Sequence, residues 1–262
     1  MCLILFAWQA HPRYSLVLAA NREEFHARPT AAAEFWQEQP GLLAGRDLQA
    51  GGTWLGITRT GRFAAITNYR EPLAPELPLE HSRGHLVRDF LTGGESPNNH
   101  AGQLHEQGAV YRGYNLLLGD PNRLSYVSNR SDQPISVDAG IHGLSNHLLD
   151  TDWPKVHSGQ AHLESILEKD VLDPEALFEL LTDRTLTPGK MPEDFENSDL
   201  PEQLMRHYFI VSPVYGTRSS TVLLLDRDGN VKFVERQFGP AGNTTGTGTF
   251  EFTIAKASYS SP

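Results

Sequence analysis

Cysteine is the scarcest residue of the chain, and its scarcity excludes two kinds of structure. Cys2 is the only cysteine among 262 residues. A single cysteine forms no internal disulfide, and zinc sites built from paired cysteines need more thiolates than this chain has. Without disulfides, nothing favours an oxidising compartment, so we expect a cytoplasmic protein.

Long apolar runs and an excess of positive charge are also missing. The apolar start, Leu3–Trp8, is far shorter than the ~20 residues of a membrane span and lacks the basic residues of a signal peptide. Lys and Arg number 22 against 32 Asp and Glu, a net charge of −10. Nucleic-acid binding needs a basic face. We therefore expect neither a membrane span nor a nucleic-acid partner.

The motifs of common cofactor and metal sites are missing too. No Gly-x-Gly-x-x-Gly opens a helix after a strand, and no P-loop occurs. His81 and His85 have the spacing of a metal-binding pair, but no obvious carboxylate accompanies them as a third ligand. The glycine-rich stretch at 242–250 is interpreted as a loop that leads into a strand. We expect no cofactor and no metal.

What the chain does contain is a series of short apolar runs separated by turn residues, a pattern typical of β-hairpins. The expected strands cover 2–8, 15–20, 53–58, 62–68, 114–119, 124–128, 219–226, 231–236 and 250–254, and the expected helices cover 82–91, 152–167 and 173–181. Hairpins interrupted by a few helices favour an α+β fold with helices covering antiparallel sheets. We expect one domain over residues 1–255 and a flexible tail at 256–262.

Cys2 has a possible catalytic role because of its position. Removal of Met1 would make Cys2 the first residue, and a free α-amino group has a pKa of about 7.7–8.0, which suits it to accept the thiol proton. Cationic neighbours, for which Arg22 and Arg218 are candidates, would favour the thiolate. The alternative is that Cys2 is a small buried residue of a strand.

Four polar clusters lie at the ends of expected strands. They are Asn21–Glu24, Asn68, the pair Ser145 and Asn146, and Arg218. Asparagine amides donate hydrogen bonds to a developing oxyanion, and arginine stabilises anions. Together with Cys2 the clusters contain the groups of a cysteine acyl hydrolase, although no histidine has a decisive context. The cluster Asn21–Glu24, taken alone, is also typical of a solvated loop.

In their order along the chain, these segments resemble one known family. The start "MC" and the stretches "LAANREEFHARP", "GGTWLGIT", "AAITNYR", "YNLLLGD", "GLSNHLLDTDWPK", "YGTRSSTVLLLD" and "FEFTI" are similar to the NRDE, or transport and Golgi organisation, family over nearly the whole chain. That family in turn resembles the N-terminal nucleophile hydrolases of the penicillin V acylase and bile salt hydrolase group. The resemblance implies a four-layer αββα sandwich of two mostly antiparallel sheets.

The resemblance also implies roles for particular residues. Cys2 would be the nucleophile, and Glu23 would take the place of the acidic residue that binds the terminal amine, where the usual signature has Asp. Asn68 and Asn146 match the asparagines of the oxyanion hole, and Arg218 matches an arginine near the nucleophile. The residues expected to contact the substrate are Asn21, Arg22, Trp54, Tyr69 and Ser145.

Two functions follow from the resemblance, and a third stays open. The first is hydrolysis or transfer of an acyl group at an amide-type bond through Cys2, which makes a small molecule the partner. The second is non-enzymatic transport of an apolar ligand, haem or an acyl-coenzyme A or lipid, because family members have been linked to lipid metabolism and haem trafficking. No sequence motif supports haem binding. The third is an interaction protein that only retains the scaffold.

Overall fold

Two antiparallel sheets form the centre of the protein in a computed structural model, which describes residues 2–70, 81–107, 110–189 and 206–255. The tail expected at 256–262 lies outside these residues. Every strand pairing in both sheets is antiparallel. The six-stranded sheet has the order β10 (Gly140–Leu144), β1 (Leu3–Trp8), β2 (Tyr14–Phe25), β11 (Tyr215–Asp226), β12 (Asn230–Phe238) and β13 (Thr244–Thr253). The seven-stranded sheet has the order β3 (Thr30–Trp36), β4 (Gln39–Asp47), β5 (Leu55–Thr58), β6 (Phe63–Asn68), β7 (Tyr114–Gly119), β8 (Leu124–Ser128) and β9 (Ile135–Ser136).

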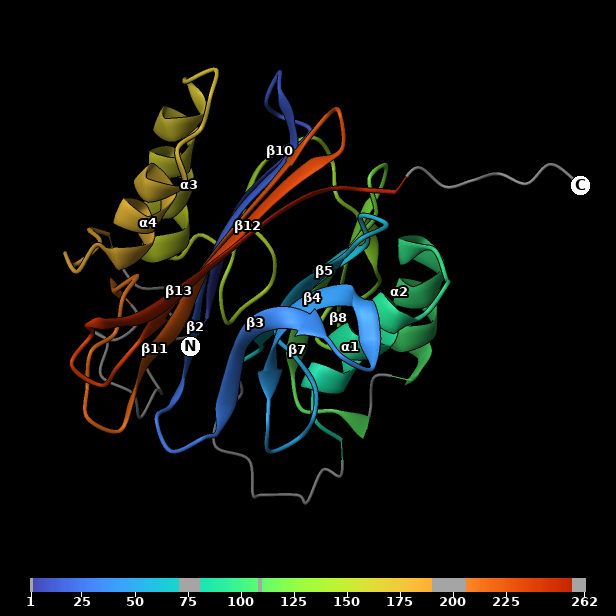
Figure 1. Ribbon diagram of the computed structural model, residues 1–262, viewed down its shortest axis with the longest axis horizontal. Coiled ribbons are helices and arrows are strands. Elements are labelled where there is room, and N and C mark those ends of the chain that lie inside the picture. Colours follow the sequence, from blue (N-terminus) through green and yellow to red (C-terminus); the bar gives the residue numbers. More distant parts are fainter. Residues whose placement is uncertain (1, 71–80, 108–109, 190–205, 256–262) are drawn as a thin grey trace, which may run out of the picture.

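Helices cover the outer face of each sheet, which completes four layers (Figure 1). The helices α3 (Pro154–Leu167) and α4 (Pro174–Thr182) lie on the six-stranded sheet, and α1 (Gly84–Thr92) and α2 (Pro97–Gln107) lie on the seven-stranded sheet. Three apolar cores fill the spaces between neighbouring layers. The fold is therefore the αββα sandwich that the family resemblance implied.

Strand β1 shows how alternation distributes side chains between two cores. Leu3 and Leu5 belong to the core beneath α3 and α4, whereas Ile4 and Phe6 belong to the core between the sheets. Successive side chains of a strand point to opposite faces, and all six residues of β1 are buried. The same alternation places the side chain of Cys2, directly before β1, on the face that looks toward the other sheet.

The sequence predictions agree with most of the elements and miss some. The expected hairpins and the helices α1, α3 and α4 are present. Helix α4 begins as predicted, because the Asp173 side chain accepts a hydrogen bond from Glu175 N at 3.0 Å. For α3, the sequence Asp-Trp-Pro predicts Asp152 as the N-cap, which is wrong, since Trp153 occupies that position without a side-chain cap. The sequence did not predict β3, β4, β9 or α2, and for β10 it predicted only that a strand precedes Ser145, without bounds.

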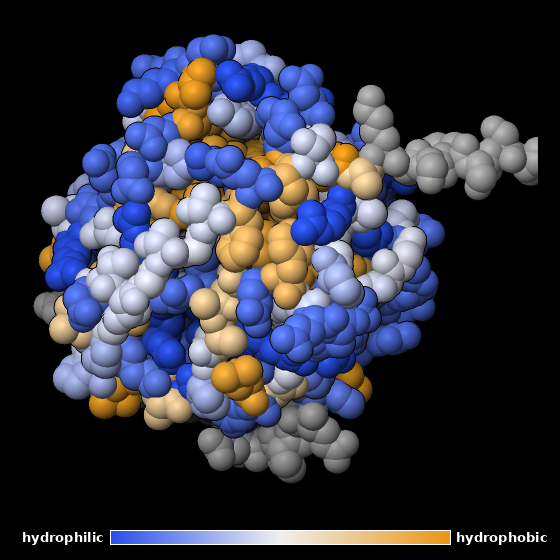
Figure 2. Space-filling view, in the orientation of Figure 1, coloured by the Kyte–Doolittle hydropathy of each residue, from blue (hydrophilic) through white to orange (hydrophobic). Residues whose placement is uncertain are grey.

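Two corrections concern segments that were interpreted as ends or loops. Strand β2 does not stop near Ala20 but continues to Phe25, so the polar run Asn21–Glu24 lies within a strand. The glycine-rich segment is also a strand, because β13 begins at Thr244 and pairs with β12 along its length. Figure 2 shows apolar residues gathered where the two sheets meet on one face of the sandwich, with polar residues around them.

Candidate active site

Cys2 lies half-buried at the wall of a pocket between the two sheets. The pocket has a volume of about 120 Å³. Its walls come from the six-stranded sheet, from the seven-stranded sheet and from the segment before α1, and they include Arg22, Trp54, Asn68 and Arg83. Residues from the start of the chain and from both sheets therefore line one pocket with Cys2.

The polar run on β2 serves two faces of the sheet. Because side chains alternate along a strand, Asn21 and Glu23 point toward the helices, and Arg22 and Glu24 point toward the pocket. Asn21 Nδ2 donates to the carbonyl oxygens of Leu181 and Tyr208 at 2.8 and 2.7 Å. Asn21, expected to contact the substrate, thus ties β2 to the helical layer on the face opposite the Cys2 side chain.

Arg22 spans the space between the sheets beside Cys2. Its guanidinium lies 4.2 Å from the ring centroid of Trp54 in the other sheet. Nη1 contacts Thr30 Oγ1 at 3.4 Å, and Nη2 lies 3.8 Å from Glu24 Oε2. Burial lowers the pKa of Arg22, although a guanidinium stays charged at any physiological pH. A fixed positive charge therefore lies next to the thiol.

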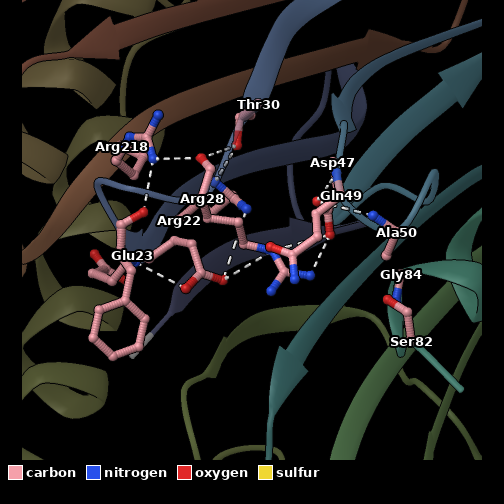
Figure 3. A network of polar contacts seen from close by, with 12 residues as sticks. Arg22, Glu23, Arg28, Thr30, Asp47, Gln49, Ala50, Ser82, Gly84 and Arg218 are labelled. Carbon is pink, nitrogen blue, oxygen red and sulfur yellow. Dashed lines mark hydrogen bonds and ion pairs between the residues drawn. The ribbon is translucent and has the colours of Figure 1, made fainter. Parts of the chain in front are cut away.

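A chain of ion pairs extends from Arg22 along the pocket wall (Figure 3). Glu24 lies between Arg22 and Arg28, at 3.8 and 3.9 Å. Asp47 receives two hydrogen bonds from Arg28, at 2.6 and 3.1 Å, and one from Gln49 N at 3.0 Å. These contacts hold the pocket wall in one arrangement, because each of these four charged side chains has a partner of opposite charge.

Glu23 is a buried carboxylate on the helix-facing side of the sheet, near the start of β1, where Cys2 lies. Oε1 accepts a hydrogen bond from Thr217 Oγ1 at 3.1 Å, whereas Oε2 is buried with no hydrogen-bond partner among the described residues. Burial raises the pKa of Glu23, and the positive charges of the amino terminus and of Lys155 act against that rise. An unpartnered buried carboxylate oxygen is costly, so this atom is suited to receive a cationic donor.

Lys155 is a functional candidate that the sequence reading did not single out. It lies in the first turn of α3, is 1% exposed, and has its pKa lowered by burial, while the charges of Glu23 and Cys2 raise it. The stretch that ends in "DWPK" contains the signal. Lysine is rarely buried. A lysine at the start of an otherwise apolar helix face could therefore have identified Lys155 as a candidate from the sequence.

The two asparagines and Ser145 flank Cys2 on the other side from Arg22. Ser145 Oγ donates to Cys2 O at 2.8 Å, and Asn146 Nδ2 donates to Asn68 O at 2.8 Å. Asn146 lies two residues beyond Leu144, which pairs with Ile4, so the same register carries Asn146 toward Cys2. These bonds connect the end of β10 to the end of β6 and hold the two sheets together beside the thiol.

The structure places Arg218 and Tyr69 apart from the Cys2 pocket walls. Arg218 is the extra residue of a β-bulge in β11, and its Nη1 donates to the carbonyl oxygens of Phe25, His26 and Arg28 at 2.9–3.2 Å. It lines a neighbouring hollow and fixes the turn between β2 and β3. The ring of Tyr69 packs against His147, with 5.1 Å between centroids.

The Cys2 thiol is not a preformed thiolate in the chain with Met1 present. Burial raises the pKa of Cys2, and the charge of Glu23 adds to this rise. The amino-terminal charge, a hydrogen bond from the main-chain N–H of Glu23 and the charge of Arg22 act in the opposite direction without cancelling it. The cations therefore act on this pKa in the expected direction, but desolvation of the sulfur is the larger effect, and the net shift is upward.

Two negative findings concern metals and membranes. Across residues 2–70, 81–107, 110–189 and 206–255, no group of three or more His, Cys, Asp or Glu side chains is arranged to hold a metal ion. Among the same residues, no helix is long and apolar enough to cross a membrane.

Comparison with solved structures shows the class of fold to which this arrangement belongs. The structure of penicillin V acylase from Agrobacterium tumefaciens superposes with a TM-score of 0.51 at 11% identity, over 97% of this chain and 86% of that one. The protein thus has an N-terminal nucleophile hydrolase-like fold.

The family follows from sequence comparison. The profile of the "Transport and Golgi organisation 2" family matches residues 1–240, and the chain belongs to this family. It is 36% identical to the human Transport and Golgi organization protein 2 homolog and 35% identical to the mouse one, over 97% of this chain and 99% of each relative.

Proposed function

We propose that the protein is a cysteine amidohydrolase or acyltransferase in which Cys2, freed by removal of Met1, attacks an amide-type carbonyl. The observation that carries the proposal is the unpartnered Glu23 Oε2 beside the Cys2 strand end. Removal of Met1 turns the Cys2 main-chain nitrogen into a primary amine, which can donate a hydrogen bond to this oxygen. When the amine accepts the thiol proton during attack, the Glu23 carboxylate stabilises the ammonium group that forms.

The reaction would proceed in two steps. In the first, Cys2 Sγ bonds to the carbonyl carbon, the thiol proton passes to the Cys2 α-amine, and that proton then goes to the departing amine as its C–N bond breaks. In the second, water attacks the thioester carbon, the C–S bond breaks, and a carboxylic acid and the thiol result. Another amine or alcohol in place of water gives acyl transfer.

The surrounding residues suit this chemistry. A neutral resting thiol is compatible with the mechanism, because the α-amine removes the proton only during attack. Asn146 Nδ2 carries two hydrogens, of which Asn68 O takes one, so the amide can donate the other to the developing oxyanion. The positive charge of Arg22 favours the same oxyanion, or a carboxylate on the substrate.

Acylation by an alkyne-bearing β-lactone tests the proposal. Intact mass of the natively expressed protein should show loss of Met1 and then one added acyl group on Cys2. Cys2→Ala should take up none. Protein made while methionine aminopeptidase is inhibited keeps the thiol but has no α-amine on Cys2, and its acylation should be at least 100-fold slower.

Amide turnover is the second readout. A panel of N-acyl amides that includes penicillin V, the substrate named for the similar structure, should release amine with the wild type and not with Cys2→Ala. Equal acylation rates with and without Met1, or turnover that survives Cys2→Ala, would overturn the proposal. In that case a non-catalytic ligand carrier is the better account of the pocket.

A further inference from the structure

A second hollow lies next to the Cys2 pocket on the same face of the six-stranded sheet. It has a volume of about 280 Å³ and is bounded by β3, β11, β12 and Trp54. Its walls include Arg218, Ser219, Glu235 and Gln237. No step of the reaction above uses Ser219, Glu235 or Gln237.

A row of polar side chains connects the two spaces. Arg22 pairs with Ser219, and Ser219 pairs with Gln237, across three adjacent strands. Directly paired residues of antiparallel strands place their side chains on the same face. The row therefore runs from Cys2 through Arg22 into the hollow, on the face toward the other sheet.

Ser219 is the first sign that the hollow receives a ligand. Ser219 is only 4% exposed, and its Oγ has no hydrogen-bond partner among the described residues. Buried hydroxyls are normally paired, because an unmade hydrogen bond costs the full desolvation of the group. A ligand group in the hollow would supply the missing partner.

Glu235 is the second sign. It is 1% exposed, and its Oε1 accepts hydrogen bonds from Ala33 N at 2.7 Å and Gln237 Nε2 at 2.9 Å. Burial raises the pKa of Glu235. A carboxylate has about four acceptor positions, and these two bonds leave acceptor capacity for a ligand that donates. The negative charge of Glu235 disfavours an anionic ligand.

The charges of the hollow are balanced, which defines the class of ligand. Among the residues that line the hollow, Arg218 carries one positive charge and Glu235 one negative charge, and Arg218 Nη1 is already engaged by three carbonyl groups of the β2–β3 turn. The charge of Arg22 also acts on Glu235, but Arg22 is paired with Glu24. A neutral group with an N–H or O–H donor satisfies Ser219 and Glu235 without adding a charge to a buried space.

The Arg22–Trp54 stack separates this hollow from the Cys2 pocket. Trp54 lines both spaces. Arg22 Nη1 contacts Thr30 in the wall of the hollow, and Nη2 faces Glu24 in the wall of the Cys2 pocket. A single small molecule can therefore reach both spaces only past this stack.

We propose that the hollow over Ser219 and Glu235 is a binding subsite for a neutral, hydrogen-bond-donating group, an amide or hydroxyl, of the molecule whose acyl carbon reaches Cys2. The assignment to the same molecule rests on the proposed function. Binding of the neutral group itself does not, because none of the three unassigned residues takes part in the reaction.

Fluorine NMR on protein labelled with 5-fluorotryptophan tests the subsite. The chain has four tryptophans, and Trp54→Phe identifies the Trp54 signal. The Cys2→Ala protein is titrated with butyramide and with butyrate, which have similar size but differ in charge and donor. Butyramide should shift the Trp54 signal saturably in the millimolar range, and butyrate should bind at least fivefold more weakly.

Variants at the hollow locate the binding. Ser219→Ala and Glu235→Gln should each weaken butyramide at least threefold, whereas Ser165→Ala, at an exposed serine of α3, should not. Ser219→Ala should leave the thermal midpoint unchanged or higher, because its hydroxyl has no protein partner to lose. Binding that is unchanged in Ser219→Ala and Glu235→Gln, or equal for butyramide and butyrate, would overturn the subsite. Cys2 acylation measured separately shows whether the proposed function fails with it.

Discussion

The guanidinium of Arg22 on the six-stranded sheet stacks on the indole of Trp54 on the seven-stranded sheet, 4.2 Å from the ring centroid. This contact closes the sandwich beside Cys2 and forms the wall between the two polar spaces. A stacked, desolvated cation–π pair contributes about 2 kcal/mol. The position of the indole therefore controls both the pocket and the attachment of the sheets.

The indole keeps its place because Gly45 has no side chain. A Cβ at Gly45 would overlap Cη2 and Cζ2 of Trp54. Gly45→Ala should displace the ring, lower stability by about 1–3 kcal/mol and shift the fluorescence of Trp54. Gly41→Ala, in the same strand, is the control, since a Cβ there meets nothing within 4 Å. Equal thermal midpoints for the two variants would contradict this account.

Lys155 and Glu23 are expected to behave as a coupled buried pair. Lys155→Met removes a positive charge that favours the ionised form of Glu23, and breaking a buried pair costs about 3–5 kcal/mol. Adding Glu23→Gln should restore much of the loss, because no unpaired charge is then buried. Urea unfolding of the two single variants and the double variant measures the coupling, and strict additivity would show that the two groups act independently.

Asn146 should matter to both stability and chemistry. Asn146→Asp cannot donate to Asn68 O, so about 1 kcal/mol of stability is lost, and it adds a negative charge where the oxyanion would form. Acylation of Cys2 should slow at least tenfold. Asn122→Asp, at an exposed turn position, controls for net charge. Lower stability with unchanged acylation would mean that Asn146 only holds the sheets together.

Glu235 makes stability depend on pH in a definite direction. Its pKa in the folded state is raised by burial above the ordinary 4.5, so the folded state holds this proton more tightly than the unfolded state. As pH rises from 4.5 through the folded pKa, the wild type loses stability relative to Glu235→Gln, and the difference becomes constant above that pKa. Unfolding free energies of both proteins between pH 4 and pH 8 check this.

The exposed Glu164 of α3 supplies the control for that series. Glu164→Gln should follow the wild type across the range, because an exposed carboxylate is solvated in both states. A wild-type curve that gains stability over Glu235→Gln as pH rises would contradict the prediction, because the hydrogen bonds from Ala33 and Gln237 would then outweigh burial.

The hairpins, α4 and the importance of the first residues could be read from the sequence because their causes are local. Asp228-Gly229 turns the chain between β11 and β12, with Gly229 at a φ of +87°, and Asp173 with Pro174 begins α4. Alternation along β1 and β2 needs only neighbouring residues. The segments that carry Cys2, Glu23, Asn68 and Asn146 were found for the same reason, since polar residues there interrupt apolar strands.

Only the tertiary structure decided where those polar residues point and what they bind. Strand β2 continues to Phe25 because partners from distant elements satisfy its polar side chains, Leu181 and Tyr208 for Asn21 and Thr217 for Glu23. A bulge in β11 turns Arg218 to the β2–β3 turn rather than to the Cys2 pocket. Burial raises the pKa of Cys2 and lowers the pKa of Lys155, and the neighbouring charges do not cancel either shift. Desolvation and long-range pairing depend on packing of the whole sandwich, and no local pattern encodes them.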